Sequence, residues 1–196
     1  MSIQLTLSGH SFSRSDLPKL SSNDQHTIEI EVITNKTLLA PFELIDETRA
    51  EKLMDIAGFG LLEDEQVIIV LDKESGIAAL MALPRVLIAT IEECYGNRFE
   101  LTTPLLHTRV CIEPTAWFYL ANDLIYIKVW SDNRLRIAEV LPRKNAEDVL
   151  YYAATIDKRF RLNGFRIVVA GTKAVESEIR STAKILNQYY KKVICE

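Results

Sequence analysis

One stretch of the chain, residues 116–171, constrains the fold more than any other. Three runs rich in aromatic and β-branched residues follow one another across two short turns, and a long amphipathic segment then leads to a last apolar run. The four runs are residues 116–121, 124–130, 134–141 and 166–171, and the turns are Asn122-Asp123 and Asp132-Asn133. Asn145 and Asp148 mark the start of a helix by a capping-box pattern, and Asn163-Gly164 marks its end. The stretch therefore predicts three antiparallel strands, a crossover helix and a further, parallel strand.

The composition is that of an ordinary globular domain. Of the 196 residues 48% are hydrophobic and 26% are charged, and the formal net charge of -4 does not favour a nucleic-acid partner. The longest apolar run, residues 77–83, is too short for a membrane span, which needs about 20 residues. The first residues lack the basic and apolar regions of a secretion signal. Three widely spaced cysteines predict free thiols, and we expect a cytoplasmic protein.

The N-terminal part of the chain shows the same order of elements. Alternating residues predict a strand at residues 3–7, a hairpin turn at Gly9-His10 and a returning strand at 11–14. A third strand is predicted at 28–32, and residues 36–44 are interpreted as a connection. A helix with Asp46 as its N-cap and two glycines after it then leads to a β-branched strand. The glycines are Gly58 and Gly60, and the strand is residues 66–71, whose continuous apolar character is typical of a strand covered on both faces.

The remaining predicted elements lie between these two parts and after the second one. A strand at 77–83, a helix with Pro84 as its first residue and Gly96 at its end, and an extended segment at 101–115 follow the first part. Residues 108–112 are the best strand candidate in that segment. A helix at 174–190 and a short strand at 193–195 end the chain, so we expect a second lobe without a final helix, truncated at its C-terminus.

The matching order of the two parts predicts an internal duplication. Three antiparallel strands, a helix and a parallel strand (βββαβ) begin the ribonuclease H-like fold, and two such lobes make the actin-like ATPase fold. We therefore predict an α/β protein with a first lobe at 1–113 and a second lobe at 114–196. The alternative is two generic α/β units that share an order by coincidence.

Two sequence motifs carry a resemblance to a known family. Residues 2–13 and residues 138–152, where the third strand leads into a helix starting Glu147-Asp148, resemble an uncharacterised bacterial family with an actin-like ATPase fold. That family has no assigned activity, so the resemblance implies a fold and no reaction.

Actin-like ATPases bind a nucleotide between their lobes, and the resemblance implies where to look for such a site. The hairpin turn of each lobe, and the end of the strand after its helix, face the nucleotide in that fold. The corresponding residues, which we consider as a candidate ligand site in an interlobe cleft, are Ser8, Gly9, His10, Asn122, Asp123, Gly171 and Thr172. The usual turn has an Asp for magnesium and glycines for the phosphates. The first turn has a glycine without a carboxylate, and the second has a carboxylate without a glycine.

Other chemistries find little support in the sequence. Two-metal nuclease catalysis needs carboxylates in the first strand, and neither candidate strand contains one. His10, His26 and His107 are far apart, and Cys111 is interpreted as a packed thiol. The basic residues around 158–166, with Arg143 and Lys144, are interpreted as a solvated helix end rather than a phosphate site. The aromatic residues at 117–130 are interpreted as core, with a partner surface as the alternative if helices leave one face open.

These observations favour a protein without catalytic residues, resident metal or cofactor. We expect a pseudo-actin-like binding or scaffold protein that recognises a protein partner or a small ligand, with no nucleic acid and no membrane span. The alternative is a divergent ATPase or sugar-kinase relative, in which Asp123 would replace the missing carboxylate and a magnesium nucleotide would be the cofactor.

Overall fold

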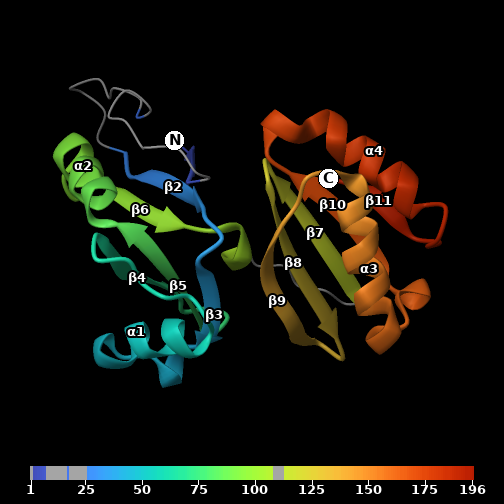
Figure 1. The fold of residues 1–196 in the computed structure, drawn as a ribbon, viewed down its shortest axis with the longest axis horizontal. Coiled ribbons are helices and arrows are strands. Elements are labelled where there is room, and N and C mark those ends of the chain that lie inside the picture. Colours follow the sequence, from blue (N-terminus) through green and yellow to red (C-terminus); the bar gives the residue numbers. More distant parts are fainter. Residues whose placement is uncertain (1, 8–16, 18–25, 108–112) are drawn as a thin grey trace. The chain divides into compact units, whose positions relative to one another are not determined.

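The computed structural model describes residues 2–7, 17, 26–107 and 113–196, and it divides into two compact α/β units (Figure 1). The first unit comprises residues 1–107 and the second comprises residues 108–196. The predicted lobe boundary between residues 113 and 114 stays a prediction. Residues 8–14 and 108–112, where two further strands were predicted, lie outside the described part of the chain.

The second unit is built on one five-stranded sheet in the order β11-β10-β7-β8-β9. Its strands are β7 (Thr115–Ala121), β8 (Leu124–Ser131), β9 (Arg134–Pro142), β10 (Arg166–Gly171) and β11 (Val193–Cys195). Strands β7, β8 and β9 form an antiparallel meander, whereas β10 is parallel to β7 and β11 is parallel to β10. The predicted βββαβ order is therefore present in this unit.

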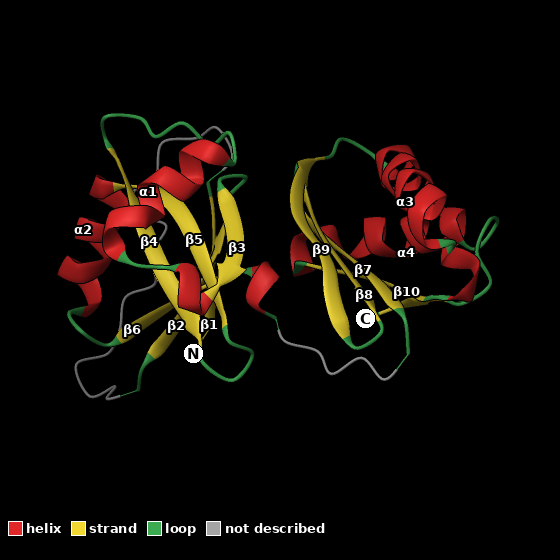
Figure 2. Ribbon diagram, turned by 90° about the horizontal axis from the view of Figure 1, so that it is seen from below, coloured by secondary structure: helices red, strands yellow, loops and turns green. Residues whose placement is uncertain are grey.

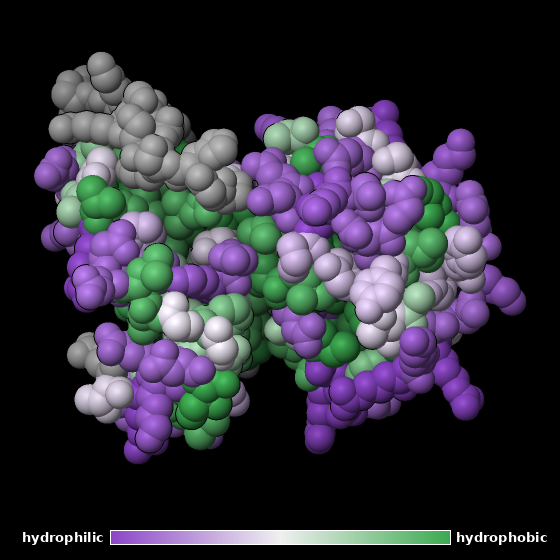
Figure 3. Space-filling model, in the orientation of Figure 1, coloured by the Kyte–Doolittle hydropathy of each residue, from purple (hydrophilic) through white to green (hydrophobic). Residues whose placement is uncertain are grey.

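Two helices cover one face of this sheet (Figure 2). They are α3 (Ala146–Phe160) and α4 (Glu176–Leu186), the latter following a 3-10 turn at Lys173–Val175. Their apolar stripes pack on Phe118, Ile127 and Ile167, which all point to the same side of the sheet because strand side chains alternate. Hydrophilic residues dominate the outer surface over α4 in Figure 3, as expected for amphipathic helices.

The connections of the second unit follow the turn chemistry of their residues. Asp132 and Asn133 both have positive φ, at 54° and 57°, which is the type I′ hairpin geometry that Asp and Asn tolerate. Helix α3 begins with the predicted capping box, in which the Asn145 side chain accepts from the Asp148 amide and the Asp148 side chain accepts in return. Its end differs from the prediction: Arg161, with φ of 56°, is the left-handed cap, and Asn163-Gly164 belong to the 3-10 turn Leu162–Gly164 that follows.

The first unit contains two three-stranded sheets rather than one antiparallel meander. Strands β1 (Ser2–Thr6), β2 (Ile28–Ile33) and β6 (Phe99–Thr102) form a parallel sheet in the order β1-β2-β6. Strands β3 (Thr37–Pro41), β5 (Ile77–Pro84) and β4 (Glu65–Asp72) form an antiparallel sheet in the order β3-β5-β4. The segment interpreted as a connection is thus partly strand β3. The predicted meander is wrong in placing 28–32 next to 11–14, since β2 lies between β1 and β6, and the predicted parallel placement of 66–71 is wrong because β4 is antiparallel to β5. Alternation specifies which side chains are buried, but not which strand lies alongside.

Helices α1 (Glu47–Ile56) and α2 (Arg85–Tyr95) cover opposite faces of strand β5 (Figure 1). Leu80 and Ala82 pack with α1, whereas Met81 and Leu83 pack with α2. Asp46 is the N-cap of α1 as predicted, because its side chain accepts from the Arg49 amide. Pro84, predicted as the first residue of α2, is instead its N-cap and is also the last residue of β5. A 3-10 turn at Phe42–Leu44 precedes α1 and another at Pro104–Leu106 ends the unit.

Strand β4 lies at the edge of its sheet, although both its faces are covered. Val67 and Ile69 pack toward the α1 side, and Ile68 and Val70 pack toward the α2 side. The prediction of cover on both faces therefore agrees with the packing, but β5 is its only neighbour among the strands of the described residues. Among the helices of the described residues, none is long and apolar enough to cross a membrane.

Candidate functional site

The candidate residues of the second unit meet at one end of its sheet. Strands β7 and β10 are parallel neighbours, so their carboxyl ends lie side by side. The exposed turn Asn122-Asp123 follows β7, and Gly171 and Thr172 end β10. The Thr172 amide donates to the Leu120 carbonyl over 3.0 Å, which ties the two ends together. Ser8, Gly9 and His10, the candidates from the first unit, lie outside the described residues.

Gly171 is required by the close approach of β7 and β10. A Cβ atom at this position would lie 2.5 Å from the carbonyl oxygen of Leu120, which is backbone and cannot move aside. Any side chain would therefore push the strands apart. The close packing of the two strands therefore accounts for the glycine.

Arg143 organises this end of the sheet, although its sequence context predicted a solvated helix end. It follows β9 directly, and its side chain is only 1% exposed. Its backbone amide donates to the Asp123 carbonyl, and its Nη2 donates to the Asn122 carbonyl. Both carbonyls of the turn are thus held by one residue, and the interpretation of Arg143 as a solvated cation is wrong.

Glu178 in the first turn of α4 balances the charge of Arg143. The Arg143 Nη1 and Glu178 Oε2 atoms are 2.5 Å apart, and the Glu178 side chain is about half exposed. A guanidinium held by a carboxylate and a carbonyl forms the short, directional bonds expected of charge-assisted pairs. The pair joins three elements that are distant in sequence: the β7–β8 turn, the end of β9 and the start of α4.

Two buried polar atoms near this pair have no hydrogen-bond partner among the described residues. They are Arg143 Nε and Thr172 Oγ1. Buried donors of this kind are uncommon in native proteins and mark places where a water or a ligand atom would be stabilised. Next to them, the Tyr152 hydroxyl donates to the Pro142 carbonyl over 2.6 Å, and burial raises the pKa of Tyr152, so the hydroxyl remains a donor at neutral pH.

The first unit has its own buried polar contact, which sequence reasoning missed. Glu31 on β2 is 4% exposed, and its Oε1 lies 2.5 Å from His107 Nε2. Its second oxygen accepts from the Gln4 side chain on β1. The parallel register places Gln4 directly beside Glu31, so this part of the contact follows from strand pairing. His107 reaches it because the 3-10 turn Pro104–Leu106 turns the chain back toward β2.

The remaining sequence candidates are dispersed. Cys94 and Cys195 are free, and Cys111 lies outside the described residues. Within the described ranges, no group of three or more His, Cys, Asp or Glu side chains could hold a metal ion.

The aromatic residues of β7 and β8 divide between the two faces of the sheet. Phe118 belongs to the core under the helices, whereas Trp117 and Tyr119 point to the other face and stack with ring centroids 5.1 Å apart. Lys128 is 2% exposed, with its Nζ 5.0 Å from the ring centroids of both Trp117 and Trp130. Such cation–π contacts stabilise a buried ammonium group. The interpretation of most of these rings as packed residues agrees with their burial.

Comparison with known proteins identifies the fold. No protein-family model matches the sequence, and no curated protein matches it. A protein of unknown function with an actin-like ATPase fold, from Bacteroides thetaiotaomicron VPI-5482, is similar in structure with a TM-score of 0.70 and 17% identity over 87% of this chain and 68% of that one. The cytoplasmic domain of EpsL, an inner membrane component of the type II secretion system of Vibrio cholerae, matches with a TM-score of 0.47 and 9% identity over 87% of this chain and 81% of that domain. The first likeness shows that the chain has an actin-like ATPase fold, as its element order and two motifs predicted.

Proposed function

We propose that this protein is a non-catalytic, pseudo-actin-like binding or scaffold protein. The observation that carries the proposal is the ion pair of the buried Arg143 with the half-exposed Glu178. Arg143 holds the turn of the second unit, where a nucleotide phosphate is bound in catalytic relatives of the fold. The Arg143 guanidinium, a group suited to anion binding, already has a carboxylate partner. A phosphate would have to displace Glu178 and leave that acidic side chain beside its own negative charge.

The sequence of the turn supports the same proposal. Asn122-Asp123 contains no glycine, and Asn122 already adopts a positive φ of 48°, so a side chain is present where phosphate loops have none. The carbonyls of the turn are both accepting hydrogen bonds from Arg143, which holds the turn in one conformation. The acidic net charge of -4 is consistent with a protein or small-molecule partner rather than nucleic acid, and we propose a bacterial, cytoplasmic protein formed by internal duplication.

Calorimetry with magnesium-ATP tests the proposal. We expect no heat of binding at micromolar concentrations and no phosphate release above the rate of buffer alone. Glu178→Gln is the informative companion, because it removes the carboxylate that occupies Arg143 and so tests whether the pair blocks anion binding. Micromolar binding of magnesium-ATP by the natural sequence, coupled to phosphate release, would contradict the proposal.

The alternative function is a divergent nucleotide-binding enzyme with Asp123 in the role of the metal carboxylate. The observation in its favour is that Arg143 Nε and Thr172 Oγ1 are buried beside the turn without described partners. Under this alternative Asp123→Ala abolishes phosphate release, whereas Asp132→Ala, in the turn at the opposite end of β8, leaves it unchanged. Equal release by both variants rejects the role of Asp123.

A further inference from the structure

Strand β4 lies at the edge of its sheet, but residues 66–71 lack the sequence features that are usual in edge strands. Residues 66–71 contain no charge, no proline and no register shift, and four of them are consecutive β-branched residues. Natural edge strands are usually blunted by lysine, proline or a bulge, since an open edge invites pairing with another strand. Strand β9, the long edge of the second unit, has Arg134, Arg136 and Pro142 and borders a bulge at Val129/Trp130. Strand β4 lacks every one of these features.

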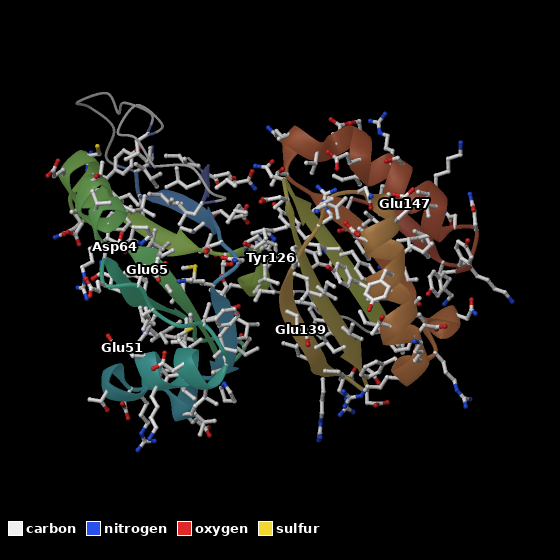
Figure 4. The ribbon with its side chains drawn as sticks, viewed as in Figure 1. Glu51, Asp64, Glu65, Tyr126, Glu139 and Glu147 are labelled. Atoms are coloured by element: carbon white, nitrogen blue, oxygen red, sulfur yellow. The ribbon has the colours of Figure 1, made fainter. Side chains whose placement is uncertain are left out.

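The register with β5 shows which backbone groups of β4 face the open edge. The Arg85 amide donates to the Asp64 carbonyl over 2.8 Å, and Pro84, which has no N–H, lies opposite Glu65. Because bonded and non-bonded pairs alternate in an antiparallel ladder, even-numbered residues of β4 bond to β5. The odd-numbered residues therefore direct their N–H and C=O groups away from the sheet, and these are Val67, Ile69 and Leu71. Figure 4 marks Asp64 and Glu65, where this open edge starts.

The side chains next to this edge are more apolar than a solvated surface requires. Leu71 at the end of β4 is 42% exposed, and Leu62 in the segment leading to β4 is 62% exposed. Ile56 at the end of α1 and Val86 in the first turn of α2 are also exposed. The Arg85 bond to Asp64 places the start of α2 beside the start of β4. Leu71 and Leu62 thus offer apolar contacts at the two ends of β4 to a strand that pairs with it.

We propose that β4 pairs antiparallel with β4 of a second copy of this chain, which joins two three-stranded sheets into one of six strands. A two-fold axis at Ile69 uses only outward-facing groups and pairs Val67 with Leu71 of the other copy. It also places Lys73 opposite Glu65, whose Oε2 atom is paired with Lys36 Nζ over 2.6 Å within the same copy, so that an ammonium group meets an acidic side chain at each end of the ladder. A shift of two residues in either direction places Glu65 opposite Leu71, or Val67 opposite Lys73, and loses this match. The self-complementary pattern of the strand identifies a second copy as the occupant, and this holds whether or not the protein binds nucleotide.

Sedimentation and light scattering of the full chain, from about 1 to about 200 μM, test the pairing. We expect a reversible monomer–dimer equilibrium. Lys73→Glu places like charges at both ends of the ladder and should raise the dimer dissociation constant about tenfold, because the change occurs twice in each dimer. Lys52→Glu, the same charge change on exposed helix α1, is the matched control and should leave the constant unchanged.

A proline substitution distinguishes dimerisation by backbone hydrogen bonds from dimerisation by side-chain contacts alone. Leu71→Pro removes an outward N–H and no bond to β5, so the monomer keeps its fold, and dimerisation should weaken about thirtyfold through two lost hydrogen bonds. Leu71→Ala keeps the backbone N–H and should weaken dimerisation less than Leu71→Pro does. Amide exchange of Val67, Ile69 and Leu71 should slow as the natural protein is concentrated. A chain that stays monomeric with unchanged exchange, or a dimer insensitive to both Lys73→Glu and Leu71→Pro, overturns the proposal.

Discussion

At the scale of single residues, the contact between Arg143 and Glu178 decides how the end of the second sheet is held. Arg143 is fully buried, and its hydrogen bonds reach two carbonyl groups and one carboxylate. In the sequence, Arg143 and Lys144 group with the basic residues around 158–166, which predicts cations at a solvated helix end. Nothing in that local pattern indicates that the chain buries the guanidinium, because its partners come from positions 122, 123 and 178.

Removing the partner of this buried cation should destabilise the second unit. Glu178→Gln leaves the Arg143 guanidinium buried without its counter-charge, and we expect the free energy of unfolding to fall by about 1–3 kcal/mol, at the low end because Glu178 is half exposed. Glu176→Gln is the matched control on the same helix, since its pair with Arg180 is exposed and contributes less than about 0.5 kcal/mol. Chemical denaturation of the two variants measures the difference. Equal stability of both variants would show that the buried pair adds nothing to folding.

At the scale of elements, the turns and caps follow their sequences closely. The Asn145 capping box, the Asp46 N-cap and a turn at Asp132-Asn133 were all expected from residue type. These features depend on contacts within about four residues, so sequence carries them. The pairing of strands is different. Alternation correctly marked β1 and β2 as strands, and a continuous β-branched run marked β4. The neighbours of β2 are nevertheless distant in sequence, and β1, β2 and β6 form a parallel sheet in place of the predicted antiparallel meander.

The Asp132 turn gives an acid-dependent contribution to stability. A hydrogen bond from the Ser131 hydroxyl, together with Arg136, lowers the pKa of Asp132 from its ordinary value of 3.8. A carboxyl group whose pKa is lowered by folding stabilises the fold above its unfolded pKa, and this contribution is lost as pH falls through the folded pKa. Asp132→Asn keeps the left-handed turn but cannot ionise. We therefore expect it to be less stable than the natural protein at neutral pH and equal to it in strong acid.

Thermal unfolding of both proteins between pH 2 and pH 7 checks this expectation. Ser75→Ala, in the β4–β5 turn of the first unit, serves as a control because it does not touch the carboxyl group of Asp132. A constant difference between Asp132→Asn and the natural protein across the whole range would mean that the effect is not due to ionisation.

At the scale of the whole molecule, each unit has its own hydrophobic core. Among the described residues, the core of the second unit is formed by residues between 116 and 193, and the two clusters of the first unit by residues between 3 and 101. A core complete within one unit predicts independent folding. We therefore expect each of the two lobes predicted from the sequence, at 1–113 and 114–196, to fold independently.

A fragment of residues 114–196 should therefore fold by itself. We expect far-ultraviolet circular dichroism of a mixed α/β protein and a cooperative thermal transition, because β7, β8, β9, α3, β10 and α4 bury a common core. A fragment that begins at residue 124 is the control, since it lacks β7, the central strand of the sheet, and should be unfolded. Loss of structure in the longer fragment would show that the second lobe needs the first.

The sequence by itself determined most element types, the N-caps at Asp46 and Asn145, the hairpin turns of the second unit and the order of elements in that unit. All of these arise from residues close together in the chain, whose propensities and hydrogen bonds agree with the final fold. The tertiary structure alone decided three other matters: the parallel pairing of β1 and β2, the edge position of β4, and the buried pair of Arg143 and Glu178. Each depends on which distant segments become neighbours. The residues of one segment show that its backbone groups need hydrogen-bond partners or that its charge needs a counter-charge. The packing of the whole fold determines which groups become those partners.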